Sequence, residues 1–234
     1  MNNEAFISEL AKINISLTEV QLQQLHMYYE MLVEWNKVMN LTGITDEEQV
    51  YLKHFYDSLT IRKVIDLTKE ETLCDIGTGA GFPGMVLKIC FPNLKVTLVD
   101  SLQKRLSFLQ AVIDKLGLTN IEIVHARAEE YAKEIREKYD VVTARAVAPL
   151  NILLEYCIPL IKTNKYFIAM KGNIFQEEKG AKQAFSKLDA FILKSETFLL
   201  PLENSYRTIM MISKKNVTNK SFPRKFSEIK KKPL

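Results

Sequence analysis

Four glycines and one acid crowd a short stretch of this sequence, residues 75–84, which reads DIGTGAGFPG. Glycine adopts positive φ without strain and lets the backbone approach a ligand closely. The stretch directly follows the apolar segment 72–76, and loops at the carboxyl ends of strands are where open α/β sheets bind nucleosides. The spacing therefore predicts a nucleoside-binding loop in which Asp75, Gly77 and Gly79 are contact positions.

Two cofactors compete for this loop. Gly79, Gly81 and Gly84 fit the GxGxxG fingerprint of dinucleotide sites, which would make the chain a nicotinamide-dependent oxidoreductase. A carboxylate at Asp75 would instead repel a pyrophosphate and favour a cation. Asp100 ends the next predicted strand, where a charged acceptor can take both ribose hydroxyls. The two acids favour S-adenosylmethionine, which carries a sulfonium and an ammonium group but no phosphate.

Residues that follow the third and fourth predicted strands are expected at the same edge of the sheet as the glycine loop. Ala128 and Glu129 follow the third strand, where a side chain and a backbone N–H would flank the adenine ring. Glu129 equally suits the first turn of a helix, because an acid there is favoured by the helix dipole. Arg145 follows the fourth strand beside small residues, a position suited to a substrate-facing group, although it could also pair with a helix end.

Several reactions are disfavoured by the residues present. The segment 145–149 reads RAVAP and lacks the Asn/Asp-Pro-Pro-aromatic loop of amine methylases. Cys157 is expected inside a helix as an apolar residue, not as a nucleophile. Attack by a lone-pair nucleophile such as guanine N7 remains; it needs in-line positioning without a general base, and proximity alone can supply roughly 7–11 kcal/mol. Arg145 and Lys171 are candidate donors to guanine O6.

The elements that must position these residues alternate along the chain. Apolar strand-length segments alternate with helix-length segments, which predicts a parallel sheet with right-handed crossovers and helices on both faces. Two further strands share a short connection that requires antiparallel pairing. The predicted strands are 72–76, 95–100, 121–126, 140–144, 166–170, 190–200 and 206–213, and the predicted helices between them are 82–91, 102–116, 128–137, 148–162 and 173–188.

The first 70 residues look helical. Ser16 and Glu19 have the spacing of a capping box, and an apolar stripe follows, so we predict a helix over 16–40. The expected organisation is an N-terminal helical extension at 1–70, a catalytic α/β domain at 71–213 and a basic tail at 214–234.

Charge is unevenly distributed. The chain has a net charge of +4, but the tail alone carries +7 and the preceding residues −3. This asymmetry suggests a polyanionic partner, although a tail that only aids solubility is the alternative. We expect the tail, with Lys37 and Arg127, to contact phosphates, and its removal to leave cofactor affinity nearly unchanged.

Composition sets the broad class. With 234 residues, 47% hydrophobic and 26% charged, the chain has the balance of a folded globular protein, not of a disordered or fibrous one. Neither a membrane-spanning stretch nor a signal peptide is recognisable. Three cysteines without a CxxC pair, and scattered histidines, indicate neither disulfides nor a metal site. A cytoplasmic monomer is expected.

Taken together, five segments resemble one family, the bacterial small-subunit ribosomal RNA methyltransferase G family. They are WNKVMNLT at 35–42, HFYDSL at 54–59, the glycine loop at 75–84, Arg145-Ala146, and the ending from FPRK at 222–225 to KPL at 232–234. The likeness spans nearly the whole chain. Residues 226–229, directly after FPRK, read FSEI, where the family is usually richer in glycine or alanine.

The resemblance implies a fold and an activity. The fold would be a Rossmann-like class I S-adenosylmethionine-dependent methyltransferase, with a seven-stranded, mostly parallel sheet containing one antiparallel strand, plus the helical extension. The activity would be methylation of guanine N7 in 16S ribosomal RNA near the decoding centre, with rRNA or the small ribosomal subunit as partner. Family positions for the cofactor fall on Gly77, Phe82, Ala128, Glu129 and Arg145. A methyltransferase acting on another RNA base or a small molecule, and a non-catalytic RNA-binding module, are the alternatives.

Overall fold

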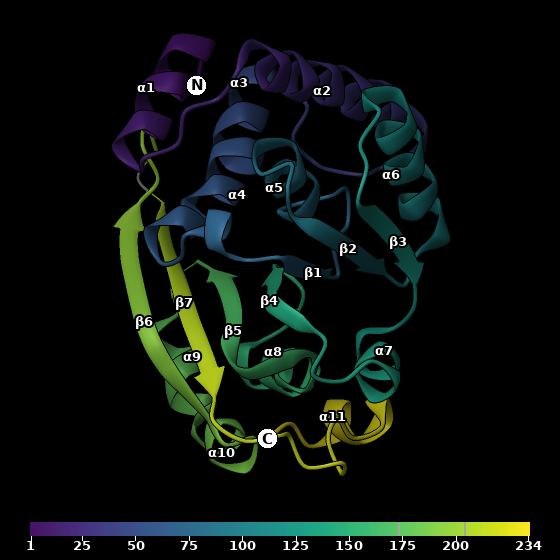
Figure 1. Cartoon of the computed structure of the whole chain (residues 1–234), viewed down its shortest axis with the longest axis vertical. Coiled ribbons are helices and arrows are strands. Elements are labelled where there is room, and N and C mark those ends of the chain that lie inside the picture. Colours follow the sequence, from purple (N-terminus) through teal and green to yellow (C-terminus); the bar gives the residue numbers. More distant parts are fainter. Residues whose placement is uncertain (173, 204) are drawn as a thin grey trace.

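A single mixed sheet forms the centre of the computed structural model, which describes residues 1–172, 174–203 and 205–234. Within these residues seven strands lie in the order β3-β2-β1-β4-β5-β7-β6 (Figure 1). Strand β7 is antiparallel to both neighbours and the other pairs are parallel, which confirms the predicted sheet. The strands are β1 Thr72–Ile76, β2 Lys95–Asp100, β3 Ile121–His125, β4 Tyr139–Arg145, β5 Ile161–Lys171, β6 Ala190–Leu199 and β7 Tyr206–Lys214.

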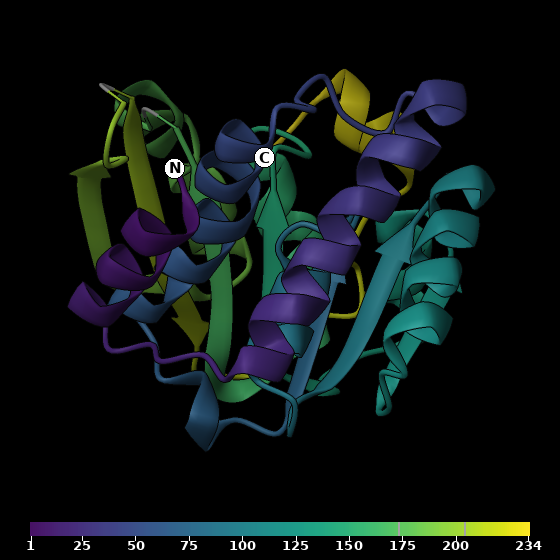
Figure 2. The same ribbon diagram turned by 90° about the horizontal axis from the view of Figure 1, so that it is seen from above.

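Helices cover both faces of this sheet. Helices α1 to α6 lie on one face and α7 to α11 on the other (Figures 1 and 2). None of the helices in the described ranges has the length and apolarity needed to cross a bilayer. The helices are α1 Asn3–Lys12, α2 Glu19–Met39, α3 Glu47–Val50, α4 Asp57–Leu59, α5 Gly84–Cys90, α6 Gln103–Leu116, α7 Ala128–Glu134, α8 Leu150–Cys157, α9 Phe175–Gly180, α10 Lys182–Lys187 and α11 Phe226–Lys231, with a π-helical stretch Tyr51–Tyr56 between α3 and α4 and 3₁₀ turns at Thr60–Lys63, Leu67–Lys69 and Ile158–Leu160.

Strand β1 shows why two apolar layers form. Successive side chains of a strand point to opposite faces. Leu73 accordingly packs with α5 and α6 in one cluster, while Cys74 and Ile76 pack with α8 in the other. Cys74, Cys90 and Cys157 are all buried, and burial raises the pKa of each thiol. This confirms that the three cysteines are apolar core residues.

Helix α2 begins later than predicted. Its N-cap is Thr18, whose Oγ1 accepts from the Gln21 N–H at 3.3 Å while Gln21 Oε1 accepts from the Thr18 N–H at 2.9 Å. The expected box of Ser16 and Glu19 was therefore wrong. Thr18 and Gln21 offer the same spacing, and Ile15 is buried in the connection from α1, so the chain is still extended at residue 16.

The N-terminal helices hold the glycine loop in place. Leu25, Tyr28 and Leu32 form the fully buried stripe of α2. The hydroxyl of Tyr28 donates to the carbonyl of Ala80 inside the loop. Gln21 Nε2 donates to two carbonyls at the end of α5, each at 3.0 Å. The helical extension is thus packed directly against the part of the sheet where the predicted site lies.

Candidate active site

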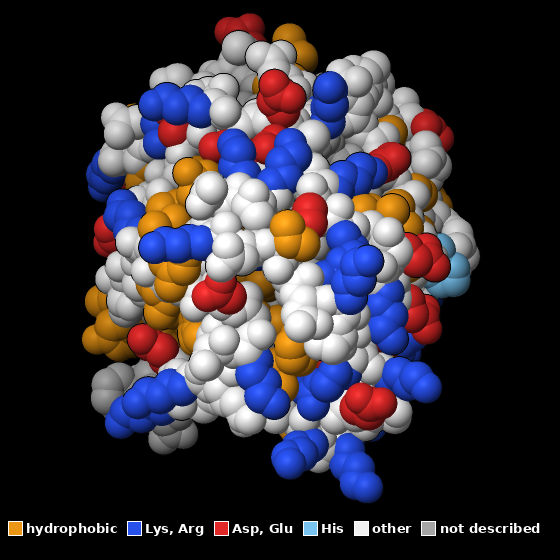
Figure 3. Space-filling view, turned by 60° about the horizontal axis from the view of Figure 1, so that its bottom comes forward, with side chains coloured by type: hydrophobic (Ala, Val, Ile, Leu, Met, Phe, Trp, Pro, Cys, Tyr) orange, Lys and Arg blue, Asp and Glu red, His pale blue; other side chains and the backbone are white. Residues whose placement is uncertain are grey.

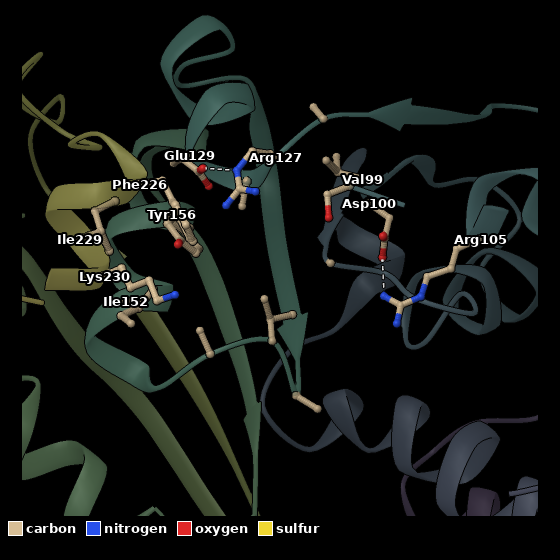
Figure 4. Close-up of a pocket in the computed structure, with 17 residues that line it drawn as sticks. Val99, Asp100, Arg105, Arg127, Glu129, Ile152, Tyr156, Phe226, Ile229 and Lys230 are labelled. Carbon is tan, nitrogen blue, oxygen red and sulfur yellow. Dashed lines mark hydrogen bonds and ion pairs between the residues drawn. The ribbon is translucent and has the colours of Figure 1, made fainter. Parts of the chain in front are cut away.

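A cavity of about 500 Å³ opens at the carboxyl ends of β1, β2, β3 and β4 (Figure 4). The chain order reverses between β1 and β4, and open α/β sheets bind ligands at such a switch point. We call this space the first cavity. Its lining residues are Gly77, Val99, Asp100, Ser101, Arg105, Ala126, Arg127, Ala128, Glu129, Ala146, Val147, Ala148, Ile152, Tyr156, Phe226, Ile229 and Lys230.

Gly77 sits where the loops after β1 and β4 meet. Its φ is +68°, and a Cβ at this position would lie 2.5 Å from Val147 Cγ2. A side chain would therefore be both strained and in collision with its neighbour. The Gly77 N–H donates to the Val99 carbonyl at 2.9 Å, which fixes the loop to the end of β2. The predicted contact position lines the cavity.

Asp100 also lines the first cavity, where it organises the surrounding backbone. Its Oδ2 accepts from the Gly79 N–H at 2.9 Å and from Arg105 Nη1 at 3.3 Å, and its Oδ1 accepts from the Leu102 N–H at 2.9 Å. A carboxylate has about four acceptor positions, so capacity for a ligand hydroxyl remains. Gly79 itself does not line the cavity; its role in the structure is this hydrogen bond.

Asp75 lies beneath the loop, outside the cavity lining. The side chain is fully buried, and its Oδ2 accepts from Thr78 Oγ1 at 2.7 Å and from the Gly84 N–H at 2.9 Å. Its Oδ1 has no hydrogen-bond partner in the part of the chain that the structure describes. Burial raises the pKa of this carboxyl to about 6. The buried side chain therefore stabilises the loop from its inner side.

Glu129 is 4% exposed at the start of α7, beside Ala128, and both line the first cavity. Its carboxylate accepts from Arg127 Nε at 2.6 Å. Arg127, an expected phosphate contact, forms part of the cavity wall, and its guanidinium lies 4.0 Å from the centroid of the Phe226 ring. Lys37, the other expected phosphate contact, pairs with Glu34 on the exposed surface of α2.

The far end of the first cavity is apolar and comes partly from the C-terminal segment. Ile152 and Tyr156 of α8 face Phe226 and Ile229 of α11 (Figure 4). Sequence reasoning assigned the basic tail to RNA and missed its contribution to this wall. The sequence did contain a signal for this wall, because Phe226 and Ile229 are apolar residues with i, i+3 spacing inside the charged segment.

A second cavity, of about 390 Å³, adjoins the first. Ala146 lines both spaces, so they meet beside the end of β4. The second cavity has four basic side chains, and the sequence analysis selected two of them. Its lining residues are Ile44, Lys53, His54, Asp57, Arg145, Ala146, Met170, Lys171, Gly172, Glu177, Arg207 and Ile209.

Arg145 belongs to the second cavity and is held there by Asp57. Nη1 of Arg145 donates to Asp57 Oδ2 at 3.0 Å and to the Lys53 carbonyl at 2.9 Å. Arg207 Nε donates to the other carboxylate oxygen of Asp57 at 3.0 Å. Asp57 is 5% exposed. One buried carboxylate therefore orients two guanidinium groups, and the sequence analysis missed both Asp57 and Arg207 as site residues.

His54 and Phe82 form the floor between the loop and Arg145. Their rings stack with centroids 4.4 Å apart, and the guanidinium of Arg145 lies 5.3 Å from the Phe82 centroid. Burial, assisted by the positive charge of Arg145, lowers the pKa of His54 to about 4, so its imidazole is neutral at pH 7. Phe82, a predicted cofactor contact, lines neither cavity and supports Arg145 from below.

Lys171, the second predicted donor, lies at the end of β5 in the second cavity. Its Nζ donates to the Ala148 carbonyl at 2.7 Å and pairs with Glu177 at 2.8 Å. An ammonium group has three donors, so one remains. Nowhere in 1–172, 174–203 or 205–234 do three His, Cys, Asp or Glu side chains gather as metal ligands. The basic residues of the second cavity can position a ligand by charge and hydrogen bonds.

Comparison with solved structures places this geometry in a known fold. TYW2 from M. jannaschii in complex with AdoMet aligns with a TM-score of 0.55 at 12% identity, covering 68% of this chain and 74% of that one. Fibrillarin from Aeropyrum pernix, with natively bound S-adenosyl-L-methionine, aligns with a TM-score of 0.50 at 14% identity, covering 66% and 72%. At these identities the likeness shows the fold alone, which is that of class I methyltransferases.

Sequence comparison identifies the family. The family model described as rRNA small subunit methyltransferase G matches residues 21–204. Ribosomal RNA small subunit methyltransferase G of Bacillus velezensis is 50% identical over 237 aligned positions, covering 100% of this chain and 99% of that protein. The protein of the same name from Listeria monocytogenes serotype 4b is 49% identical, with 100% of both covered. The chain therefore belongs to the rRNA small subunit methyltransferase G family.

Proposed function

We propose that this chain transfers the methyl group of S-adenosylmethionine to N7 of a guanine in 16S rRNA near the decoding centre. Family membership makes the chain an rRNA methyltransferase with S-adenosylmethionine as methyl donor. The observation that supports the finer proposal most is the contact between the two cavities at Ala146. A donor in one and a base in the other would meet at the end of β4.

The first cavity suits the cofactor by the chemistry of its walls. Asp100 has a free acceptor position for a ribose hydroxyl, and the backbone of Gly77 lines the same space. The backbone and side chain at Ala128 and Glu129 line the end expected to take the adenine. When bound, the cofactor supplies an electrophilic methyl group on sulfur.

The second cavity suits the electron-rich edge of guanine. That edge presents two acceptors, O6 and N7, and Arg or Lys donors recognise them in nucleic-acid complexes. Lys171 and Arg207 can donate to O6 while N7 stays free. Arg145 is held in the same cavity by Asp57 and the Lys53 carbonyl.

No proton has to be removed from guanine N7 before it attacks, since its lone pair lies in the ring plane. His54 is neutral at pH 7 and stacked on Phe82, so it contributes shape without adding charge. The site then acts by holding the base in line with the methyl group and excluding water, which is the contribution of proximity. Direct transfer without a general base follows.

The RNA is expected to approach over the end of the molecule that carries α11. Figure 3 brings this end forward and shows Lys and Arg side chains gathered along its lower edge. Lys225, Lys230, Lys231 and Lys232 are exposed there. Neutralising phosphates releases counterions, so these lysines would add sequence-independent affinity. A ribosomal substrate supports action in the cytoplasm.

The test is methyl transfer from labelled S-adenosylmethionine to two substrates from cells lacking the gene, namely purified 16S rRNA and small ribosomal subunits. Nucleoside mass spectrometry should find 7-methylguanosine in at least one of them, and the pair identifies which assembly state is recognised. The same reactions with the Lys171→Met variant test whether methylation depends on this donor in the second cavity. A different methylated nucleoside, or none despite intact cofactor binding, would contradict the proposal.

A further inference from the structure

The C-terminal segment is anchored to the body of the protein before it reaches α11. Arg136 donates from Nη1 to the Phe222 carbonyl and from Nη2 to the Thr218 carbonyl, each at 2.6 Å. Lys214 is fully buried and pairs with Glu137 at 2.6 Å. These contacts fix the path of the chain from the end of β7 to the underside of α7.

Arg224 then clamps α11 at both ends. Its backbone N–H and its Nε donate to Glu155 Oε1 at 2.8 Å, and its Nη2 donates to Glu155 Oε2 at 2.7 Å. Glu155 is fully buried in α8. The remaining Nη1 of Arg224 donates to the Lys232 carbonyl beyond the last turn of α11, at 3.0 Å. A buried carboxylate that engages one arginine at three donors makes a specific joint, not a general attraction.

The end of the chain is anchored as well. Ile229 is fully buried and Leu234 nearly so, both within the apolar cluster around α8. Asn151 Nδ2 donates to the Leu234 carbonyl at 2.9 Å. A tail whose function was limited to solvated contacts with RNA would not need these buried contacts.

The consequence of this anchoring is the position of Phe226. Its ring lies in the wall of the first cavity, beneath the guanidinium of Arg127 at 4.0 Å, and Arg127 in turn is bound to Glu129 at 2.6 Å. Figure 4 shows Phe226, Tyr156 and Ile152 together on one side of the cavity, and Asp100 with Arg105 on the other. The polar side suits a ribose and the aromatic side suits a flat base.

We propose that Phe226 is a cofactor-binding residue that packs on the adenine of S-adenosylmethionine, and that Arg224 with Glu155 are its positioning residues. The proposal rests on the proposed function, since it uses the same cofactor site. It assigns the C-terminal segment to the cofactor as well as to RNA. It also reverses the expectation that removing the tail leaves cofactor affinity unchanged.

The test measures the affinity of the full-length protein for S-adenosylmethionine by calorimetry. Phe226→Ala should raise Kd roughly tenfold, because a base stacked on an aromatic side chain loses about one to two orders of magnitude in affinity on alanine substitution. Phe226→Trp should restore most of it. Phe226 is 41% exposed, so the thermal midpoint should hardly change. Ser227→Ala, the next residue of the same helix, is the matched control and should bind as the wild type does.

A second probe locates the contact within the cofactor. 5′-Methylthioadenosine contains the nucleoside but no amino-acid portion, so Phe226→Ala should weaken it by the same factor as S-adenosylmethionine. Arg224→Gln should raise KM for the cofactor while leaving kcat near that of the wild type. The double variant Arg224→Gln, Phe226→Ala should bind the cofactor little more weakly than Phe226→Ala alone, because both substitutions remove the same interaction.

Equal Kd values for the wild type and Phe226→Ala would overturn the proposal. Additive losses in the double variant would overturn the positioning role of Arg224. A wild-type protein that binds neither probe would count against the proposed function itself, which separates the two failures.

Discussion

Nη1 of Arg145 lies 3.0 Å from Oδ2 of Asp57, across 88 residues of chain. The side chains are 15% and 7% exposed, so the pair is largely removed from water. Arg207 occupies the second oxygen of the same carboxylate. The second cavity is therefore built around one buried acid that holds two guanidinium groups.

Replacing Asp57 with alanine should destabilise the protein and impair methyl transfer. Removing one partner of a buried ion pair leaves an uncompensated charge and costs about 3–5 kcal/mol. Asp57→Asn keeps one acceptor and should lose less stability while still lowering kcat. Urea unfolding and rRNA methylation assays measure the two effects. Glu34→Ala, which removes an exposed acid paired with Lys37, is the control and should change stability by less than about 1 kcal/mol.

Lys171→Met should lower kcat for rRNA methylation and leave the Kd for S-adenosylmethionine within about twofold. The substitution keeps the length of the side chain but removes the donors that the second cavity needs for O6, and a hydrogen bond from a charged donor contributes about 1.5–3 kcal/mol. Single-turnover methylation and calorimetry separate the two quantities. An unchanged rate would remove Lys171 from the site.

Asp100→Ala should raise the Kd for S-adenosylmethionine at least tenfold, because a charged acceptor for the ribose is lost. The variant also frees the Gly79 and Leu102 N–H groups, so its unfolding must be measured alongside. Asp100→Asn retains one acceptor oxygen and separates the two effects. If both variants bind the cofactor as the wild type does, Asp100 is a loop residue and not the ribose acceptor.

Acid should destabilise the wild type partly through His54. Its pKa is about 4 when folded and about 6.5 when unfolded, so between these values only the unfolded state takes up the proton. The stabilising contribution is complete above pH 6.5 and is lost as the pH falls towards 4.

The free energy of unfolding of the wild type, minus that of His54→Asn, should fall by about 2 kcal/mol between pH 7.5 and pH 5. The pKa of Asp75 is raised to about 6, so this carboxyl makes the folded state more stable as the pH falls, opposite to His54. Because the effect is the same in the wild type and in His54→Asn, it cancels in the difference between them. A difference that does not vary with pH would show that His54 is not buried as a neutral ring.

Exposed lysines of the C-terminal segment should set the salt dependence of rRNA binding. Each phosphate contact adds about 0.7–0.9 to the slope of log K against log salt. The double variant Lys225→Gln, Lys231→Gln should therefore flatten the slope by about 1.4–1.8 if each lysine makes one contact. Lys12→Gln with Lys115→Gln removes the same charge from α1 and α6 and should leave the slope unchanged. Equal slopes in the two double variants would place the RNA elsewhere.

Local sequence patterns were sufficient to predict the sheet and its loop. The segments 72–76 and 95–100 match β1 and β2 because short apolar runs bounded by turn residues specify buried strands. The order of strands then places Gly77, Asp100, Glu129 and Arg145 at one edge, since parallel strands end on the same side. The family motifs identified the same edge as a methyltransferase site, and family membership excludes the dehydrogenase alternative.

Local patterns were ambiguous where two positions offered the same chemistry. Ser16–Glu19 and Thr18–Gln21 have equal spacing, and the burial of Ile15 selected the second. The DIGTGAG stretch suggested that Asp75 faces the ligand, but the side chain turns inward to hold Thr78 and Gly84. A sequence indicates that a carboxylate is near a loop, whereas the packing around it decides which donors it meets.

Periodicity and motifs of adjacent residues were enough to predict the fold class, the glycine loop and the family. The contacts of Asp57 with Arg145 and with Arg207, 150 residues further along the chain, are seen only in the folded protein, as is the place of Phe226 in the wall of the first cavity. Burial explains the difference: a charge or an aromatic ring becomes part of a site only when distant segments exclude water from around it, and no local pattern records which segments those are.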